Sequence, residues 1–108
     1  MSTGETDRFV SPAAPVTPAV AELVTILGEE CAEVIVRASK LLRFGPEEVQ
    51  PGHFHTNAQR LGHEIGDLFE MVDRLVLAGL ITPASVQHGR DSKRKNLAKY
   101  LQHQEPKP

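Results

Sequence analysis

Apolar residues recur every three or four positions between Pro18 and Leu42, which is the period of an α-helix rather than that of a strand. Thr17 is placed to cap the start of this helix, and Pro18 occupies the first helical position, where a missing N–H does no harm. Gly45 and Pro46 end the segment. The repeating apolar positions are Val20, Leu23, Val24, Leu27, Cys31, Val34, Ile35, Ala38, Leu41 and Leu42.

A second helix is expected from Asn57, which we interpret as its cap, to about Gly79, a residue type that commonly ends helices. Thr82 and the proline after it repeat the cap signal and open a third helix, which has few apolar positions and should break near Gly89. The apolar stripe of the second helix consists of Leu61, Ile65, Leu68, Met71, Val72, Leu75 and Val76.

The predicted fold class is all-α: an antiparallel helical bundle of two long helices plus a shorter C-terminal helix, with a loop at 47–56. One domain should span 18–103, between a flexible N-terminal arm, 1–17, and a flexible tail, 104–108. The stripe of the second helix is broader than one neighbouring helix can cover. We therefore expect oligomerisation, as a homodimer or homotetramer, to complete the bundle.

Composition narrows the functional classes. A chain of 108 residues is one domain at most. The net charge of −2 and an aromatic content of 5% give no case for nucleic-acid binding. The single cysteine, Cys31, excludes an intrachain disulfide, and we expect it, like Tyr100, to be a core residue. No membrane-length apolar run and no signal-peptide pattern are present, so a cytoplasmic location with no membrane partner is expected.

Each long helix carries two acidic residues, three positions apart, on the face that should be buried. Glu30 and Glu33 form this pair on the first helix, and Glu64 and Asp67 form it on the second. Ionised carboxylates do not enter an apolar core without a partner, and no Lys or Arg is placed to pair with all four. A divalent cation resolves this conflict most simply. Ligand sets made only of carboxylate oxygens suit hard ions, Mg²⁺ or alternatively Mn²⁺.

Residues 29–34, EECAEV, and residues 64–68, EIGDL, resemble a family signature. The pattern is the E-E-x-x-E and E-[LI]-G-D-[LV] motif pair of the MazG-like all-α nucleoside triphosphate pyrophosphohydrolases. The resemblance covers the first two helices and extends into the third, over 23–101. It implies a Mg²⁺-dependent enzyme that uses water to convert a nucleoside triphosphate to a monophosphate and pyrophosphate.

The resemblance also implies roles for individual acids. Glu30, Glu33, Glu64 and Asp67 would be the metal ligands, and Glu29 would be an outer acid or the group that orients the water. The chemistry is compatible with the residues themselves, because phosphoryl transfer needs positioning and charge neutralisation more than covalent catalysis.

The third helix carries the positive charge that a triphosphate would need. Lys93, Lys95 and Arg90 are candidates for phosphate binding, and Asn96 is a candidate for a hydrogen bond to sugar or phosphate. A solvated helix face would explain the same charges equally well. The motif that follows in family members is matched loosely, by Lys95, Asn96 and Lys99.

Two other functions remain open on the sequence. A non-catalytic helical oligomer, acting as a regulatory or scaffold module, would keep the fold without turnover. A small nucleic-acid binder that uses residues 90–99 is a weaker alternative, because it gives the inward-facing acids no role. His63 and Glu64 do not begin an H-E-x-x-H zinc motif, because the second histidine would have to stand at position 67, which is Asp67.

Overall fold

The computed structural model describes residues 15–104, which divide into two compact units on either side of Leu80 and Ile81. The first unit contains helices α2, Pro18–Phe44, and α3, Asn57–Leu77. The second contains helix α4, Pro83–Asn96, and a short 3₁₀ helix, η1, Leu97–Lys99. The described residues form helices and no strands, so the all-α prediction is confirmed.

Helix α2 begins and ends as its sequence predicts. The Thr17 hydroxyl accepts a hydrogen bond from the Val20 N–H at 3.2 Å. At the other end the chain turns at Gly45, whose φ of 91° is open to glycine and strained for other residues. The Gly45 N–H donates to the Leu41 carbonyl at 2.9 Å, which satisfies one of the last carbonyls of the helix.

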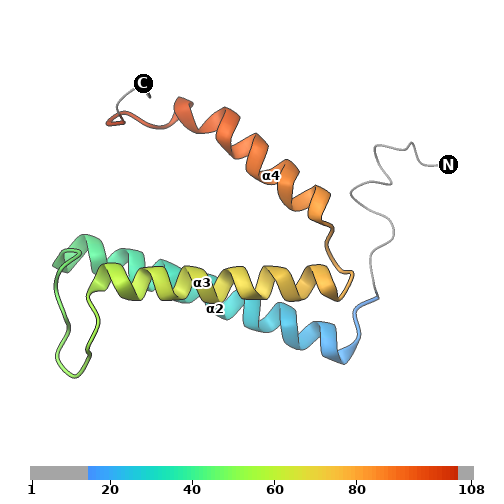
Figure 1. The fold of residues 1–108 in the computed structure, drawn as a ribbon, viewed down its shortest axis with the longest axis horizontal. Helices are drawn as coiled ribbons and strands as arrows, with labels where there is room; N and C mark the ends of the chain where they lie inside the picture. Colours follow the sequence, from blue (N-terminus) through green and yellow to red (C-terminus); the bar gives the residue numbers. More distant parts are fainter. Residues whose placement is uncertain (1–14, 105–108) are drawn as a thin grey trace. The chain divides into compact units, whose positions relative to one another are not determined.

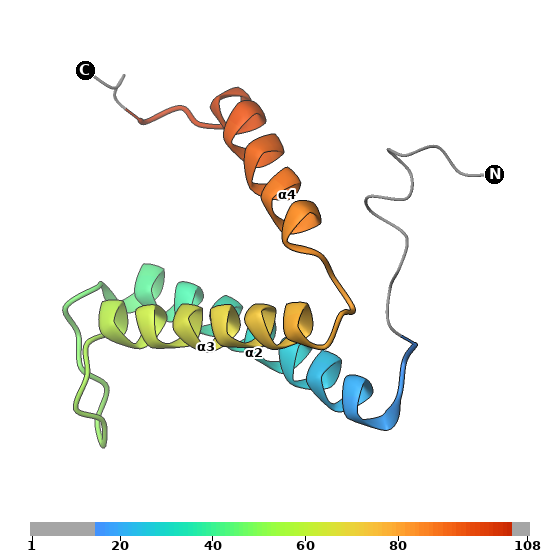
Figure 2. The same cartoon turned by 45° about the vertical axis from the view of Figure 1, so that its right-hand side comes forward.

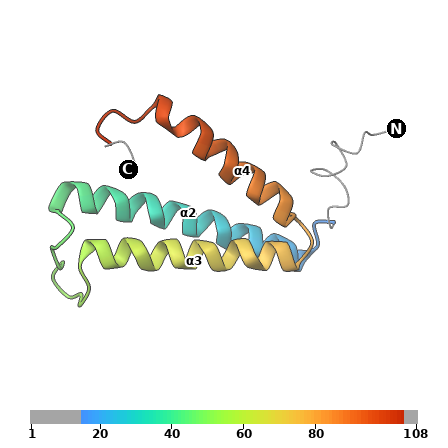
Figure 3. The same cartoon turned by 45° about the horizontal axis from the view of Figure 1, so that its top comes forward.

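Helix α3 runs antiparallel to α2 and lies beside it along most of its length, as Figures 1, 2 and 3 all show. Its cap is Thr56 rather than Asn57, which corrects the prediction. The Thr56 hydroxyl accepts from the Gln59 N–H, and the Gln59 side chain accepts from the Thr56 N–H, so two orphan donors are satisfied reciprocally.

Asn57 instead anchors the loop between the helices. Its side chain is 1% exposed and donates to the Gly45 carbonyl at 2.9 Å and to the Glu48 carboxylate at 3.1 Å. The loop is also held by an isolated antiparallel bridge between Val49 and Thr56. One buried amide thus fixes the end of α2 to the start of α3.

The hairpin buries a narrow line of residues on each helix, which we call the contact line. Val20, Met71 and Leu75 are buried, and the other apolar members are half-buried. The contact line consists of Val20, Leu23, Leu27, Glu30, Val34 and Leu41 on α2 and of Asn57, Leu61, Glu64, Leu68, Met71 and Leu75 on α3.

Several predicted core residues lie outside this line. Cys31 is exposed, so its assignment to the core is wrong within this chain. Ile35 is 69% exposed and Leu42 is 83% exposed, although both belong to the predicted stripe of the first helix. The sequence stripe is therefore wider than the surface that α3 covers.

Helix α4 is continuous from Pro83 to Asn96, and the expected break at Gly89 does not occur. The Thr82 hydroxyl caps it by accepting from the Ser85 N–H at 3.0 Å. No residue of α4 is fully buried, and Tyr100 after it is 74% exposed, which corrects its assignment to the core. No helix in the described part of the chain has both the length and the apolarity to cross a bilayer.

Candidate metal centre

Carboxyl groups from both helices of the hairpin converge on one point. Glu30 on α2 and Glu64 and Asp67 on α3 each offer one oxygen, and these oxygens lie within 4.8 Å of one another. Glu30 and Glu64 are half-buried on the contact lines, whereas Asp67 is exposed at their edge. Three of the four acids that the sequence assigns to the metal therefore lie together.

A proton or a cation would stabilise the two half-buried acids, Glu30 and Glu64. One oxygen of Glu30 and one of Glu64 are shut off from solvent without a hydrogen-bond partner. Two ionised carboxylates hold no hydrogen to share, so a hydrogen bond between them requires a proton on one. The hydrogen bond that a protonated Glu30 would donate to Glu64 is the main cause that raises the pKa of Glu30, followed by burial and by the charges of Glu64, Asp67 and Glu33.

The other two predicted acids lie outside this cluster. Glu33 is exposed, and its charge acts on Glu30, but its oxygens are not among the three that converge. Glu29 is exposed as well. The side chain of Glu33 lies one turn after Glu30 on the same edge of α2, so a different rotamer would be needed to bring it to the cluster.

Within residues 15–104 no basic side chain forms an ion pair with the cluster. The ion pairs of the described residues join Arg74 to Glu70 and Arg94 to Asp91, and neither includes the three acids. Arg37 lies two helical turns after Glu30, and its Nη1 atom is shut off from solvent without a partner. The sequence reasoning missed Arg37, although its seven-residue spacing from Glu30 places both on the same edge of α2.

The donor set fits a hard divalent cation. Carboxylate oxygens are the ligands that Mg²⁺ and Mn²⁺ prefer, and two oxygens without partners are suited to a positive charge. Asp67 is the open side of the cluster, where water or a phosphate oxygen could complete the coordination. Exposed acids alone are common in proteins without metals, so the enclosed oxygens of Glu30 and Glu64 are the informative feature.

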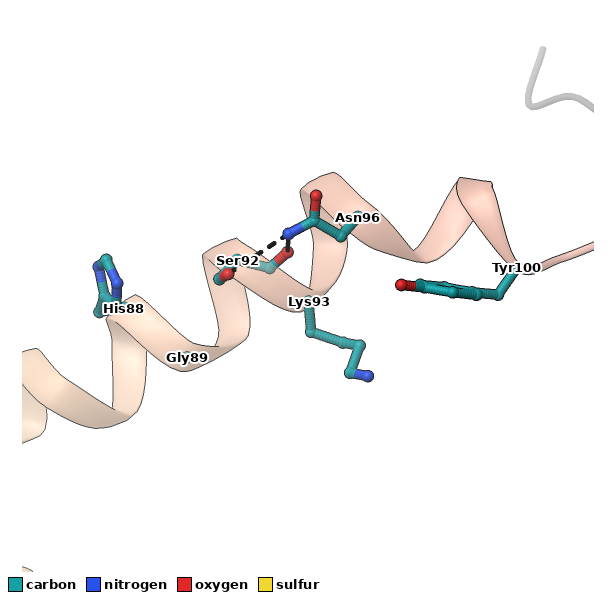
Figure 4. A pocket seen from close by; sticks show the side chains of 6 residues that line it. All are labelled: His88, Gly89, Ser92, Lys93, Asn96 and Tyr100. Carbon is teal, nitrogen blue, oxygen red and sulfur yellow. Dashed lines mark hydrogen bonds between the residues drawn. The ribbon is translucent and has the colours of Figure 1, made fainter.

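Helix α4 presents the predicted phosphate-binding residues in its own unit. His88, Ser92 and Asn96 follow one edge of the helix at four-residue intervals, and Lys93 and Tyr100 project beside them (Figure 4). They line a shallow groove of about 410 Å³. A second groove, of about 320 Å³, includes Lys95 but not Arg90. The candidate phosphate-binding side chains Lys93, Lys95 and Arg90 are all exposed.

Asn96 is already engaged within α4. Its Nδ2 donates to the Ser92 carbonyl at 2.9 Å and lies 3.5 Å from the Ser92 hydroxyl, as the dashed lines in Figure 4 show. One amide hydrogen is thus occupied, and the amide oxygen is the side of Asn96 that a ligand could use. A donor ligand, such as a sugar hydroxyl, would suit that oxygen better than phosphate.

The chain matches no protein-family model, no curated protein and no solved structure. The resemblance to the MazG-like enzymes therefore rests on the two acidic motifs alone.

Proposed function

We propose that this protein is a Mg²⁺-dependent nucleoside triphosphate pyrophosphohydrolase that releases a nucleoside monophosphate and pyrophosphate. One observation carries the proposal: three carboxyl groups from two helices meet at one point, and two of their oxygens are enclosed without a partner. A cation between them would satisfy both oxygens at once. The acidic motifs EECAEV and EIGDL, which supply these groups, favour the pyrophosphohydrolase reaction over other metal-dependent chemistry.

The position of each acidic residue indicates the role that we propose for it. Glu30, Glu64 and Asp67 would hold Mg²⁺ or Mn²⁺, with Glu33 joining them from the same edge of α2. When bound, the ion would neutralise phosphate charge and lower the pKa of a coordinated water. Glu29, exposed next to Glu30, is the proposed group that accepts a proton from the attacking water.

Each of the two units has basic residues of its own that could bind a phosphate. Arg37, with its enclosed and unpaired guanidinium nitrogen, is the candidate in the hairpin. Lys93, Lys95 and Arg90 are the candidates on α4, and all three are exposed. Arginine binds phosphate oxygens in a fixed bidentate geometry, whereas lysine acts as a mobile point charge. Arg37 would therefore hold a phosphate in a fixed orientation, whereas the lysines of α4 would attract phosphate without fixing its orientation.

We propose that the active form is a cytoplasmic homodimer or homotetramer. The hairpin leaves large apolar side chains exposed, including Ile35, Leu42 and Phe69, and a second chain would cover them.

The proposal is tested by incubating the purified protein with a panel of ribonucleoside and deoxyribonucleoside triphosphates and Mg²⁺. We expect monophosphate and pyrophosphate in equal amounts, and no product after chelation of the metal. Glu64→Gln and Asp67→Asn should each abolish turnover while the helical content stays unchanged. Asp73→Asn is the matched control, because Asp73 is an exposed acid of α3 outside the cluster.

Two results would contradict the proposal. If neither product formed with any triphosphate, the protein would not be a pyrophosphohydrolase. If Asp67→Asn kept the activity of Asp73→Asn, the cluster would not be the catalytic centre.

A non-catalytic helical oligomer is the second candidate function. It is favoured by the hydrogen bond from the Asn96 amide to the Ser92 carbonyl, which occupies within α4 a residue that was a candidate for substrate binding. In that case a shared proton would satisfy Glu30 and Glu64, and Mg²⁺ would not raise the melting temperature. Thermal unfolding with and without Mg²⁺ therefore separates the two candidates.

A further inference from the structure

Helix α2 carries a second line of uncharged residues, all of them exposed except the half-buried Ala38, which we call the open seam of α2. Each of its members except Ala38 directly follows a residue of the contact line. The spacing alternates between four and three residues, as it does along the seam of a helical bundle. Leu42 and Ile35 are among the most exposed large apolar residues of the hairpin. The open seam of α2 consists of Val24, Gly28, Cys31, Ile35, Ala38 and Leu42.

Helix α3 has an open seam with the same construction. Its members also directly follow the contact line, and they repeat the same alternation of four and three residues. Phe69, in its middle, is 57% exposed, whereas Ile65, Val72 and Val76 are half-buried. The open seam of α3 consists of Ala58, Gly62, Ile65, Phe69, Val72 and Val76.

The two open seams lie on the same broad side of the hairpin. Each is rotated from its contact line by one residue, about 100°, in the direction of the chain. The helices run antiparallel and face each other, so equal rotations about their axes point both seams to the same side. Glu33 and Asp67, which precede contact-line residues, point to the opposite side. The hairpin thus has one open face without charged residues and an opposite face with charges of both signs, since Lys40, Arg60 and Arg74 also precede contact-line residues.

The open face is large enough for a stable dimer. Over the 21 residues of α3, two adjacent helices present a face about 31 Å long and roughly 20 Å wide. Burying it on two copies removes on the order of 1,200 Å² from solvent, which reaches the range of specific interfaces. Neither open seam contains a charged residue, so the face does not favour a charged partner. Helix α4 of the same chain is too polar to be a partner for an apolar face.

The open face also matches itself in shape. The contact of Glu30 with Glu64 and Asp67 sets the register of the hairpin. In that register Gly28 is level with the turn of Phe69, and Ile35 is level with the turn of Gly62. A side chain added at Gly28 or Gly62 would meet nothing within 4 Å in the chain, so both glycines leave hollows beside large residues.

We propose that the open face binds a second copy of the chain about a two-fold axis parallel to the helices. In this arrangement α2 of each copy lies against α3 of the other, and each Phe69 sits over the partner's Gly28. The charged faces then point outwards on both sides, so Glu33 and Asp67 of one copy stay apart from those of the other. This inference specifies the assembly proposed above and does not depend on the hydrolase chemistry.

The test compares two leucines of equal exposure in the full-length protein. Leu42 lies in the open seam and is 83% exposed, whereas Leu77 lies on the far side of α3 and is 84% exposed. We expect sedimentation equilibrium to give a wild-type mass of two chains or a multiple of two. Leu42→Glu should raise the dissociation constant of this dimer about 100-fold, because each copy would bury an unpaired charge. Leu77→Glu should leave it unchanged.

A second variant tests the fit of Phe69 against glycine. Gly28→Leu should strengthen α2 by itself, because glycine is the poorer helix former and the space around it is open. In the proposed dimer the same side chain would collide with the partner's Phe69 and weaken association. A wild-type monomer, equal effects of Leu42→Glu and Leu77→Glu, or a Gly28→Leu dimer as tight as wild type would each overturn the proposal. Triphosphate hydrolysis, measured on the same samples, reports separately on the acidic cluster.

Discussion

At the scale of single residues, the carboxyl pair Glu30 and Glu64 is the feature that a purely structural role explains least well. Each occupies a contact-line position where a leucine would pack, and each has an oxygen without a partner. Two neighbouring ionised carboxylates repel each other, and burial penalises the charge of each. Retaining two acids in contact is therefore unfavourable unless a proton or a cation occupies the space between them.

Protonation of Glu30 gives the metal-free protein a distinctive pH dependence. Because the pKa of Glu30 is raised above 4.5 in the folded state, the folded chain holds this proton more tightly than the unfolded chain. The stability that it contributes is present at low pH and is lost as the pH rises through the folded pKa. We expect Glu30→Gln to raise the melting temperature of the metal-free protein at about pH 7.5, and to raise it progressively less as the pH falls toward 4.5.

Thermal unfolding by circular dichroism over this pH range, in the presence of a chelator, provides the measurement. Glu29→Gln is the control, because Glu29 is the exposed neighbour of Glu30 and has no place in the cluster. A Glu30→Gln effect that is the same at every pH would show that the two carboxyl groups do not share a proton.

At the scale of the helices, local sequence signals define the ends, and a single long-range contact fixes the loop. Thr17, Thr56 and Thr82 cap the three helices by the same hydroxyl-to-N–H bond. Such caps are short-range and can be read from sequence. The contact from Asn57 to the Gly45 carbonyl joins residues twelve apart and depends on the path of the loop.

Removing the buried amide should loosen this connection. Asn57→Ala would leave the Gly45 carbonyl and the Glu48 carboxylate without their donor. We expect it to lower the free energy of unfolding by about 2 kcal/mol. Thr56→Ala, which removes only a cap, should lower it by about 1 kcal/mol. Urea denaturation of the two variants checks the order, and an Asn57→Ala loss no larger than that of Thr56→Ala would contradict it.

How far the sequence could predict this fold follows from what its patterns encode. Periodicity and caps predict three helices, and the placement of Glu30 and Glu64 on apolar stripes predicts that their carboxyl groups meet. The same stripe on α2 contains two adjacent seams, and nothing local distinguishes the one that faces α3, so Cys31 and Leu42 were assigned to the core. Asparagine is common at helix caps, but the side chain of Asn57 binds the Gly45 carbonyl across the loop, and Thr56 is the cap instead.

At the scale of the whole chain, the two units differ in what stabilises them. The hairpin has a buried line of side chains, whereas α4 has no buried residue within its unit. A polar helix of 14 residues is marginal by itself, because helices in proteins gain most of their stability from packing. The amides of α4 should therefore exchange faster than those of the hairpin unless a ligand or partner orders them.

Hydrogen exchange can assign the ligand of each unit in one experiment. Adding Mn²⁺ alone should slow exchange near Glu30 and Glu64, because the cation binds the folded hairpin and suppresses its opening. It should leave the exchange rates of α4 unchanged, because the lysine and arginine side chains of that helix repel a metal ion. Adding a non-hydrolysable nucleoside triphosphate with Mg²⁺ should also slow exchange in α4, over residues 89–96, because phosphate would bridge its lysines.

Substitutions on α4 decide whether that second protection comes from phosphate binding. Lys93→Ala and Lys95→Ala should remove it, whereas Arg94→Ala should not, because Arg94 is already paired with Asp91. If α4 stayed unprotected while the hairpin was protected by the nucleotide, the triphosphate would be held by the acidic cluster and Arg37 alone. The positive charge of α4 would then be a solvated helix face, which is the alternative that its sequence pattern also allows.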